Sequence, residues 1–275
     1  METKISIITV NRNNAAGLKK TITSVIAQTY TNFEFIIIDG ASTDNGVEVI
    51  REYADRLAYW ISEPDNGTYH AMNKGVKVSK GEYCFFLNSG DFLIDNKVFE
   101  KIFSHNINSD IVSGNVLKVR ANNKFRRVSS PNSISLHKLC IRSLPHQATL
   151  IKKSLFDEIG YYTESYKIAS DWEFFLKALV VFEKSYQHLD MDFSYFTMDG
   201  ISSMEESSQL AREESTECLK LIFPKLADDL IDYRYFYNSN FGQIVTQLKK
   251  KEKLYKFVDN VCGWLLKSKK TIAGK

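Results

Sequence analysis

Ile5-Ser6-Ile7-Ile8-Thr9-Val10 is the stretch that decides the fold, because an unbroken β-branched run of this length is typical of a strand buried on both faces. Phe33 to Ile38 has the same character. Between them, the apolar residues of 18–26 fall on one face of a helix. A buried strand, a helix and a second buried strand predict a parallel pair joined by a crossover helix.

The alternation of strands and helices continues along the chain. Further strands are expected over residues 58–61, 83–87, 110–119, 124–128, 148–151, 186–189 and 193–197. Further helices are expected over residues 47–57, 69–76, 155–159 and 171–181, and from residue 203 onward. The sequence therefore predicts an α/β fold built on a mostly parallel, doubly wound sheet, with a helical C-terminal extension.

The composition limits the class of protein. The 275 residues are 44% hydrophobic and 25% charged, which is ordinary for a globular chain with one large domain and an appendage. No apolar stretch approaches the roughly 18 residues of a membrane span, and the first residues lack the regions of a secretory signal. The four cysteines form no C-x-x-C pair, which argues against zinc and redox sites. We therefore expect a cytoplasmic protein.

Polar residues follow three of the expected strands. They are Thr9-Val10-Asn11, Asp39-Gly40 and Asn88-Ser89-Gly90-Asp91. Parallel α/β sheets bind their ligands at the carboxyl ends of the strands, where such residues would meet. A single polar strand end is usually only a turn, but three together predict a binding site.

Five segments, taken in order, resemble family 2 glycosyltransferases, the inverting enzymes of the GT-A fold. The segments are residues 7–11, 37–44, 63–67 with 71–75, 81–83 with 86–91, and 169–173. The resemblance covers about residues 4 to 200, and the run from Glu63 to Asp91 most resembles bacterial enzymes of colanic-acid and capsular polysaccharide synthesis. It implies that a sugar moves, with inversion, from a nucleotide-diphosphate sugar to a glycan or a lipid-linked saccharide.

The resemblance assigns the donor site to the first hundred residues. Asp39 is expected to accept the N3–H of uracil, which favours a UDP-sugar donor. The alternative is that Asp39 only caps the turn that follows, while Asp44 caps the next helix. The full set of expected donor-binding residues is Thr9, Val10, Asn11, Asp39, Asp65, Asn88 and Ser89.

Asp91 is the expected metal ligand. A divalent cation, Mn²⁺ or Mg²⁺, stabilises the charge that develops on a departing diphosphate. The matching family motif usually carries several aspartates, but here Asn88 and Gly90 stand at the earlier positions. On this basis Gly90→Asp is expected to strengthen metal binding. The alternative is an ordinary turn aspartate.

Asp171 is the expected catalytic base, because inverting transfer needs a carboxylate that accepts the proton of the attacking hydroxyl. The family places this base in an acidic pair at a helix start, but Ser170 replaces the first acid here. Glu173 is the fallback base. The alternative is that Ser170 and Asp171 cap the helix.

The acceptor side is expected to include His146, Trp172 and Glu173. A lone histidine is more often structural, and aromatic residues on a helix, such as Trp172, Phe174 and Phe175, are usually core. Gly200-Ile201-Ser202 resembles a loop that closes over the donor. We expect a catalytic domain over residues 1–200, with a nucleotide-sugar half (1–100) and an acceptor half (101–200), followed by the extension (201–275).

Other function classes fit the first strand end less well. A sugar-phosphate nucleotidyltransferase would need a glycine-rich loop there, and a dinucleotide-dependent oxidoreductase would need G-x-G-x-x-G. Asn11-Arg12-Asn13-Asn14-Ala15 contains no glycine. A catalytically weak nucleotide-sugar-binding protein stays open, because Asn88, Gly90 and Ser170 replace acidic residues.

The basic character of the chain lies in its tail. Residues 248–275 hold nine lysines against Glu252 and Asp259, whereas the net charge of the whole chain is only +3. Leu254, Val258, Val261 and Leu265 fall at helical spacing among these lysines. Such a helix is expected either to lie on an anionic membrane surface or to pack on its own domain. No nucleic-acid partner is expected.

Overall fold

The computed structural model describes residues 4–119, 124–197, 205–252 and 254–262. The chain forms two compact units, Met1–Cys218 and Leu219–Lys275. The sequence placed the boundary at residues 200/201. In the structure the first unit also includes most of helix α8 (Glu205–Ile222).

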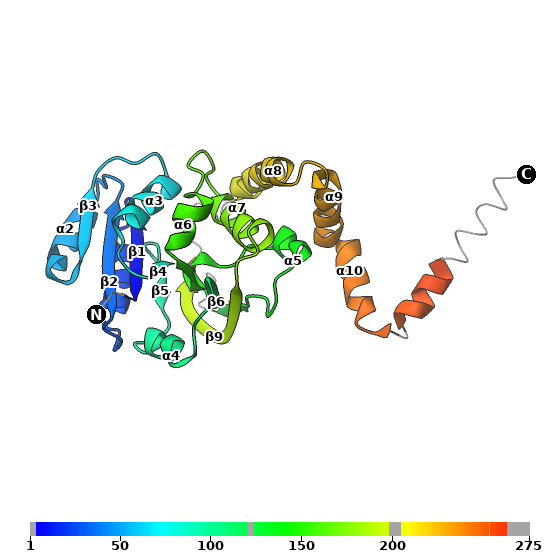
Figure 1. The fold of residues 1–275 in the computed structure, drawn as a ribbon, viewed down its shortest axis with the longest axis horizontal. Helices are drawn as coiled ribbons and strands as arrows, with labels where there is room; N and C mark the ends of the chain where they lie inside the picture. Colours follow the sequence, from blue (N-terminus) through cyan, green and yellow to red (C-terminus); the bar gives the residue numbers. More distant parts are fainter. Residues whose placement is uncertain (1–3, 120–123, 198–204, 253, 263–275) are drawn as a thin grey trace, which may run out of the picture. The chain divides into compact units, whose positions relative to one another are not determined.

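One mixed sheet carries the first unit, with strand order β3-β2-β1-β4-β8-β6-β9-β5 and β7 paired to β6 (Figure 1). β1 to β4 are parallel to their neighbours within that set, whereas β8 is antiparallel to both β4 and β6. The strands are β1 (Ile5–Asn11), β2 (Phe33–Asp39), β3 (Tyr59–Ser62), β4 (Tyr83–Phe86), β5 (Phe92–Leu93), β6 (Ile111–Val119), β7 (Phe125–Val128), β8 (Thr149–Lys152) and β9 (Tyr186–Phe196).

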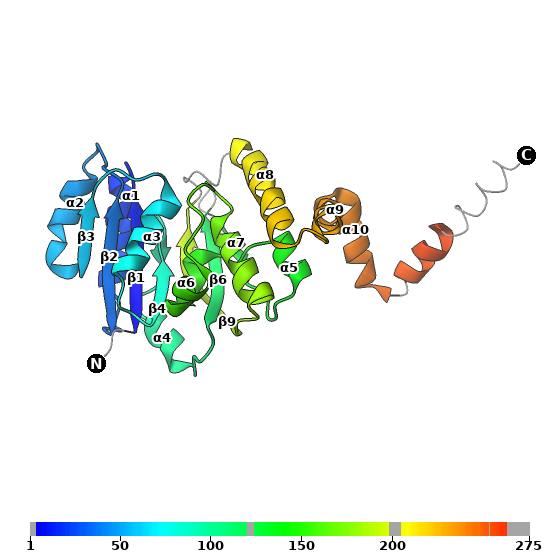
Figure 2. The same ribbon diagram turned by 45° about the horizontal axis from the view of Figure 1, so that its top comes forward.

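Helices cover both faces of the sheet, which confirms the predicted α/β fold. The helices of the first unit are α1 (Ala15–Ile26), α2 (Gly46–Glu52), α3 (Thr68–Val78), α4 (Val98–Ser104), α5 (Leu136–Ile141), α6 (Ser154–Ile159) and α7 (Ser170–Leu176), before α8. α3, α6 and α7 lie on one side of the sheet and α4 on the other (Figures 1 and 2). α7 continues into a π-helical turn, Lys177–Val181.

Three features depart from the expected elements. The helix expected over residues 47–57 ends at Glu52 and resumes as a 3₁₀ turn, Ala54–Arg56. The short β5, α4 and α5 were not expected. The strands expected over 186–189 and 193–197 are one strand, β9, which pairs with β6 from Tyr186 to Phe196. In the polar stretch between the expected strands, Arg127 pairs with Asp190 (3.0 Å) and Asp192 (2.5 Å).

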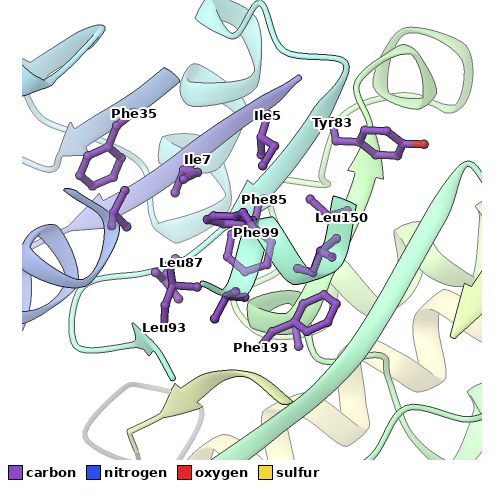
Figure 3. Packing of buried hydrophobic residues seen from close by; sticks show 14 of the residues in the cluster. Ile5, Ile7, Phe35, Tyr83, Phe85, Leu87, Leu93, Phe99, Leu150 and Phe193 are labelled. Atoms are coloured by element: carbon purple, nitrogen blue, oxygen red, sulfur yellow. The ribbon is translucent and has the colours of Figure 1, made fainter. Parts of the chain in front are cut away.

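The hydrophobic core on the α4 side is built around β1 and β4. Ile5 and Ile7 of β1 and Phe85 of β4 are fully buried, and Figure 3 shows them converging with Phe99 of α4. Phe85 and Phe99 meet edge to face, with 5.3 Å between ring centroids. This packing holds β1 and β4 side by side, so their carboxyl ends lie at the same edge.

An aromatic cluster packs the opposite face and fixes α7 on the sheet. Phe86 of β4, Phe156 of α6, Tyr162 and Phe174 of α7 contact one another, with ring centroids 4.7 to 6.2 Å apart. Asn73 of α3 bonds both backbone groups of Tyr162, donating to its carbonyl (2.9 Å) and accepting from its amide (3.1 Å). The loop at Tyr162, between α6 and α7, is thereby held against α3.

The second unit contains α9 (Ala227–Asn238), α10 (Asn240–Lys249) and a further helical stretch over residues 254–262. Leu254, Phe257 and Val261 of this stretch are exposed, Phe257 by 65%. None of the described helices is long and apolar enough to cross a membrane.

Gly75→Ala tests the packing of α3 on β1. Alanine in a helix interior normally stabilises by roughly 1 kcal/mol relative to glycine. Here the new methyl group would lie 2.4 Å from Cγ2 of the buried Ile8, so we expect a loss of about 1–3 kcal/mol in the free energy of unfolding. Urea unfolding of the parent and the variant measures this loss. In an Ile8→Ala background the same change should no longer destabilise, and stabilisation by the single change would contradict the packing.

Candidate active site

The carboxyl ends of β1, β2 and β3 are tied together by the carboxylate of Asp39. Its Oδ1 accepts from Asn11 Nδ2 (2.7 Å) and Ser42 Oγ (2.6 Å), and its Oδ2 accepts from the Ser42 amide (2.9 Å) and Ser62 Oγ (2.7 Å). Burial favours a higher pKa for Asp39, but these hydrogen bonds outweigh it and hold the pKa below the usual value. Asp39 is therefore a charged hub of the strand ends.

This geometry constrains the predicted uracil contact. The side chain of Asp39 is fully buried, and its four accepting positions are all used. A uracil N3–H could bond Asp39 only by displacing one of the serine or asparagine donors. Asp44 is not the N-cap of α2 that the sequence predicted, because that position is Asn45, which makes no side-chain cap bond. Asp44 instead accepts from the Gly46 amide in the first turn of α2 (2.9 Å) and from the Ala15 amide (2.8 Å).

Asp65 reaches the same edge across Gly40. Its Oδ1 accepts from the Gly67 amide (2.9 Å), and a methyl group placed on Gly40 would lie 2.3 Å from its Oδ2. A side chain at position 40 would therefore require the Asp65 carboxylate to move. The side chain of Arg12 borders the same space, with Cδ 3.5 Å from that methyl position, although no role was predicted for it.

Two of the predicted donor residues serve mainly to join β1 to the segment after β4. Thr9 is fully buried and donates from Oγ1 to the Leu87 carbonyl (2.7 Å). The Val10 carbonyl accepts from the Ser89 amide (3.1 Å), and Asn14 Nδ2 donates to the Ser89 carbonyl (3.1 Å). The Thr9 side chain and the Val10 carbonyl, together with the Asn14 side chain, thus hold the loop of the predicted metal motif in place.

Asp91 is buried beside the end of β9. Its Oδ1 accepts from the Thr197 amide (3.0 Å), and only 5% of the residue is exposed. Burial raises the pKa of Asp91 to about 7, against the opposing effects of the Thr197 amide, His146 and the side chain of Gln147. Because these contacts offset the cost of burial only in part, a positively charged ligand would further stabilise the ionised form of Asp91.

Gly90 cannot take the side chain that the sequence suggested for it. Its φ is +101°, a conformation that favours glycine. A Cβ there would lie 3.0 Å from Thr197 Oγ1 and 3.3 Å from Asn14 Nδ2. Gly90→Asp would therefore strain the loop that carries Asp91, which argues against the expectation that this substitution strengthens metal binding.

The residues around Asp91 fit a divalent cation that arrives together with a diphosphate. No three His, Cys, Asp or Glu side chains gather into a ready metal site in the described part of the chain. Asn88 Oδ1, however, is buried and without a hydrogen-bond partner among the described residues. One carboxylate and one amide oxygen are hard ligands, and Mg²⁺-type sites commonly add substrate phosphates and water to such a pair.

Asp171 lies in the first turn of α7, with its carboxylate held from three sides. Oδ2 lies 3.1 Å from His146 Nδ1, and Oδ1 accepts from the Trp172 amide (2.8 Å) and lies 3.2 Å from the Tyr69 hydroxyl. About 15% of the Asp171 side chain is exposed. Burial and the nearby Asp171 raise the pKa of Tyr69 well above its usual value, so this hydroxyl keeps its proton.

Ser170 does not cap α7. The cap position is Ala169, without a side-chain cap bond, and Ser170 Oγ is buried with no hydrogen-bond partner in the described ranges.

His146 connects the two halves of the site. With its proton on Nδ1 toward Asp171, its Nε2 faces Asn88 Nδ2 at 3.5 Å. The structure thus brings Asp171, His146, Asn88 and Asp91 together.

The other two predicted acceptor-side residues, Trp172 and Glu173, make structural contacts within the fold. Trp172 is buried and donates from Nε1 to the Leu139 carbonyl of α5 (2.6 Å). Glu173 is buried, accepts from Thr163 Oγ1 (2.5 Å) and pairs with Lys177 (2.7 Å). These contacts agree with the structural alternative, and each carboxylate oxygen of the fallback base already has one partner. Gly200-Ile201-Ser202 lies outside the described residues.

Sequence reasoning missed Tyr69, Gln147 and Thr197, which contact Asp171 or Asp91. The sequence predicted for Tyr69 only a place on the apolar face of a helix. Gln147 directly follows His146, a predicted site residue. Thr197 contributes a backbone amide, which any residue type supplies. Of these, only Gln147 carried a usable sequence signal.

Known proteins and a family model are similar in sequence to this chain. The family model "Glycosyl transferase family 2" matches residues 6–168. The chain is 34% identical over 186 residues to an uncharacterized glycosyltransferase of Mycobacterium tuberculosis, covering 65% of this chain and 70% of the relative. It is 30% identical over 176 residues to a PGL/p-HBAD biosynthesis glycosyltransferase of Mycobacterium bovis, covering 62% and 67%.

Solved structures share the fold. Staphylococcus aureus TarS 1–349 with UDP-GlcNAc has a TM-score of 0.64 at 19% identity, covering 92% of this chain and 78% of that one. The mannosyltransferase PcManGT of Pyrobaculum calidifontis with GDP-Man and Mn²⁺ has a TM-score of 0.63 at 13% identity, covering 97% and 81%. With the strand-end site and the match to the family model, these findings identify the chain as a member of glycosyl transferase family 2, and so as a glycosyltransferase.

Proposed function

We propose that the chain transfers a sugar with inversion from a UDP-sugar to a glycan or lipid-linked saccharide, with Asp171 as the base. The observation that carries this proposal is the link from Asp171 through His146 to Asn88, beside Asp91. A partly exposed carboxylate lies at one end of this link and the predicted diphosphate site at the other. The related structures bound to UDP-GlcNAc and GDP-Man support a nucleotide-sugar donor.

The reaction places the proton on Asp171. The acceptor hydroxyl gives its proton to a carboxylate oxygen of Asp171, and the hydroxyl oxygen attacks the anomeric carbon from the face opposite the diphosphate. The new glycosidic bond forms as the bond to the diphosphate oxygen breaks, and the nucleoside diphosphate leaves. His146 holds Oδ2 and the Trp172 amide holds Oδ1, so the carboxylate keeps one orientation.

The donor end is formed by the strand ends. Asn11, Asp39 and Asp65 would frame the nucleoside, and Asn88 and Ser89 would face the diphosphate. Asp91 and the side-chain Oδ1 of Asn88 would hold Mn²⁺ or Mg²⁺, and the cation would supply charge stabilisation to the departing diphosphate. We assign the acceptor to bacterial polysaccharide synthesis of the colanic-acid type, and the site of action to the cytoplasmic face of the membrane.

Asp171→Asn should lower turnover by roughly two to four orders of magnitude and leave donor affinity nearly unchanged, because only the proton acceptor is lost. Turnover is measured as nucleoside diphosphate released from the nucleotide sugar that most raises the melting temperature in a screen of UDP- and GDP-sugars with Mn²⁺. Calorimetry gives donor affinity. Glu173→Gln is the matched control and should stay within a few-fold of the parent. Full turnover by a folded Asp171→Asn chain would rule out this base.

Asp91→Ala should weaken Mn²⁺-dependent donor binding by at least roughly tenfold, because it removes the carboxylate of the proposed cation site. Asp55→Ala, which removes an exposed carboxylate, is the control. Donor titrations with Mn²⁺ and with EDTA measure the effect. Equal donor affinity and turnover of the parent chain in EDTA would show that the reaction does not use a metal.

The tail should bind anionic membranes. Each lysine near such a surface contributes roughly 1 kcal/mol, and the exposed Leu254, Phe257 and Val261 add apolar contact. Co-sedimentation at low salt should recover the full chain with anionic vesicles but not with neutral ones. A chain ending at Gln247 should stay in the supernatant with both. If the two chains partition alike with anionic vesicles, the tail packs on its own protein instead.

A further inference from the structure

A buried glutamate from α8 holds the backbone just before the proposed base. Glu214 Oε1 accepts from the Lys167 amide (2.7 Å), and Oε2 accepts from the amides of Ile168 (3.0 Å) and Ala169 (2.9 Å). Only 7% of Glu214 is exposed. These three amides are consecutive and lead directly into α7, which begins at Ser170. Glu214 belongs to the same compact unit, which extends to Cys218.

The arrangement demands a carboxylate. The amides of Lys167, Ile168 and the cap residue Ala169 precede α7 and have no partner within it, and an unpaired buried amide is costly. An ionised carboxylate accepts at both oxygens, so one side chain satisfies all three amides. A glutamine in the same place has one accepting oxygen, and its NH₂ group would face at least one of the amides. Charge-neutral replacement therefore releases part of the segment 167–169.

The same segment touches the base through Tyr69. The Tyr69 hydroxyl lies 2.6 Å from the Ile168 carbonyl and 3.2 Å from Asp171 Oδ1. A shift of Ile168 would move this hydroxyl, and a shift of Ala169 would move the first turn of α7. Both routes end at the carboxylate of Asp171.

We propose that Glu214 is a positioning residue for the reaction: from α8 it fixes the segment 167–169 and, through it, the orientation of Asp171. This inference rests on the proposed function, in which Asp171 is the base. It makes α8 part of the catalytic unit. Neither the family motifs nor the expected domain boundary at residues 200/201 includes this helix.

Glu214→Gln tests the proposal against Glu213→Gln, which changes an exposed neighbour on α8 whose carboxylate accepts from Gln209 (2.9 Å). Release of nucleoside diphosphate from the nucleotide sugar chosen by thermal shift is the readout. Glu214→Gln should lower kcat by roughly ten- to a hundredfold, the scale of a small misplacement of a reacting group, with donor Kd within about twofold. Glu213→Gln should leave both unchanged. Glu214→Asp, which keeps the charge on a shorter side chain, should recover part of the loss.

A double variant separates positioning from general stability. In an Asp171→Asn background, Glu214→Gln should cause no further loss of kcat, because its effect passes through Asp171. An equal further loss in that background, or a rise in donor Kd that matches the fall in kcat, would overturn the proposal. If Glu214→Gln does not fold, Glu214→Asp gives the same two comparisons. Full turnover by Asp171→Asn would instead refute the proposed base.

Discussion

The parallel register that pairs Asn11 of β1 with Asp39 of β2 is the constraint on which the site depends. It brings the two polar strand ends to one edge of the sheet. There Asn11 donates a hydrogen bond that stabilises the buried carboxylate of Asp39. Ser62 at the end of β3 joins the same carboxylate. Asp39 thus links the ends of three neighbouring strands, and the loops of the proposed site begin from this rigid edge of the sheet.

The second half of the chain reaches this frame through packing on the opposite face. The aromatic cluster of Phe86, Phe156, Tyr162 and Phe174 sets the distance of α7 from β4, and Asn73 fixes the loop at Tyr162 against α3. The position of Asp171 is therefore set by contacts that are mostly apolar. Polar contacts, from His146 and the Trp172 amide, then set only its orientation.

The fold was predictable where the pattern is local. β1, β2 and β4 are rich in β-branched and aromatic residues, and the family motifs at their ends predicted that Asp39, Asn88 and Asp91 lie at one edge. The join within β9 was not predictable, because Asp190 and Asp192 interrupt its apolar pattern, and the partner that offsets them, Arg127, lies on another strand. Contacts across the fold, such as those of Tyr69 with Asp171, leave no periodic signal in the sequence.

The thinned acidic motif also has a physical consequence. Asp91 and Asp171 both lie near one imidazole, and further carboxylates at positions 88, 90 and 170 would add like charges to a buried site. Asn88 and Ser170 keep polar atoms there without charge, and Gly90 permits the turn that buries Asp91. With so little fixed negative charge, the site has weak intrinsic attraction for a free cation and little repulsion for a diphosphate. Cation and nucleotide sugar are therefore expected to bind as one ligand, each supplying the charge that the other lacks.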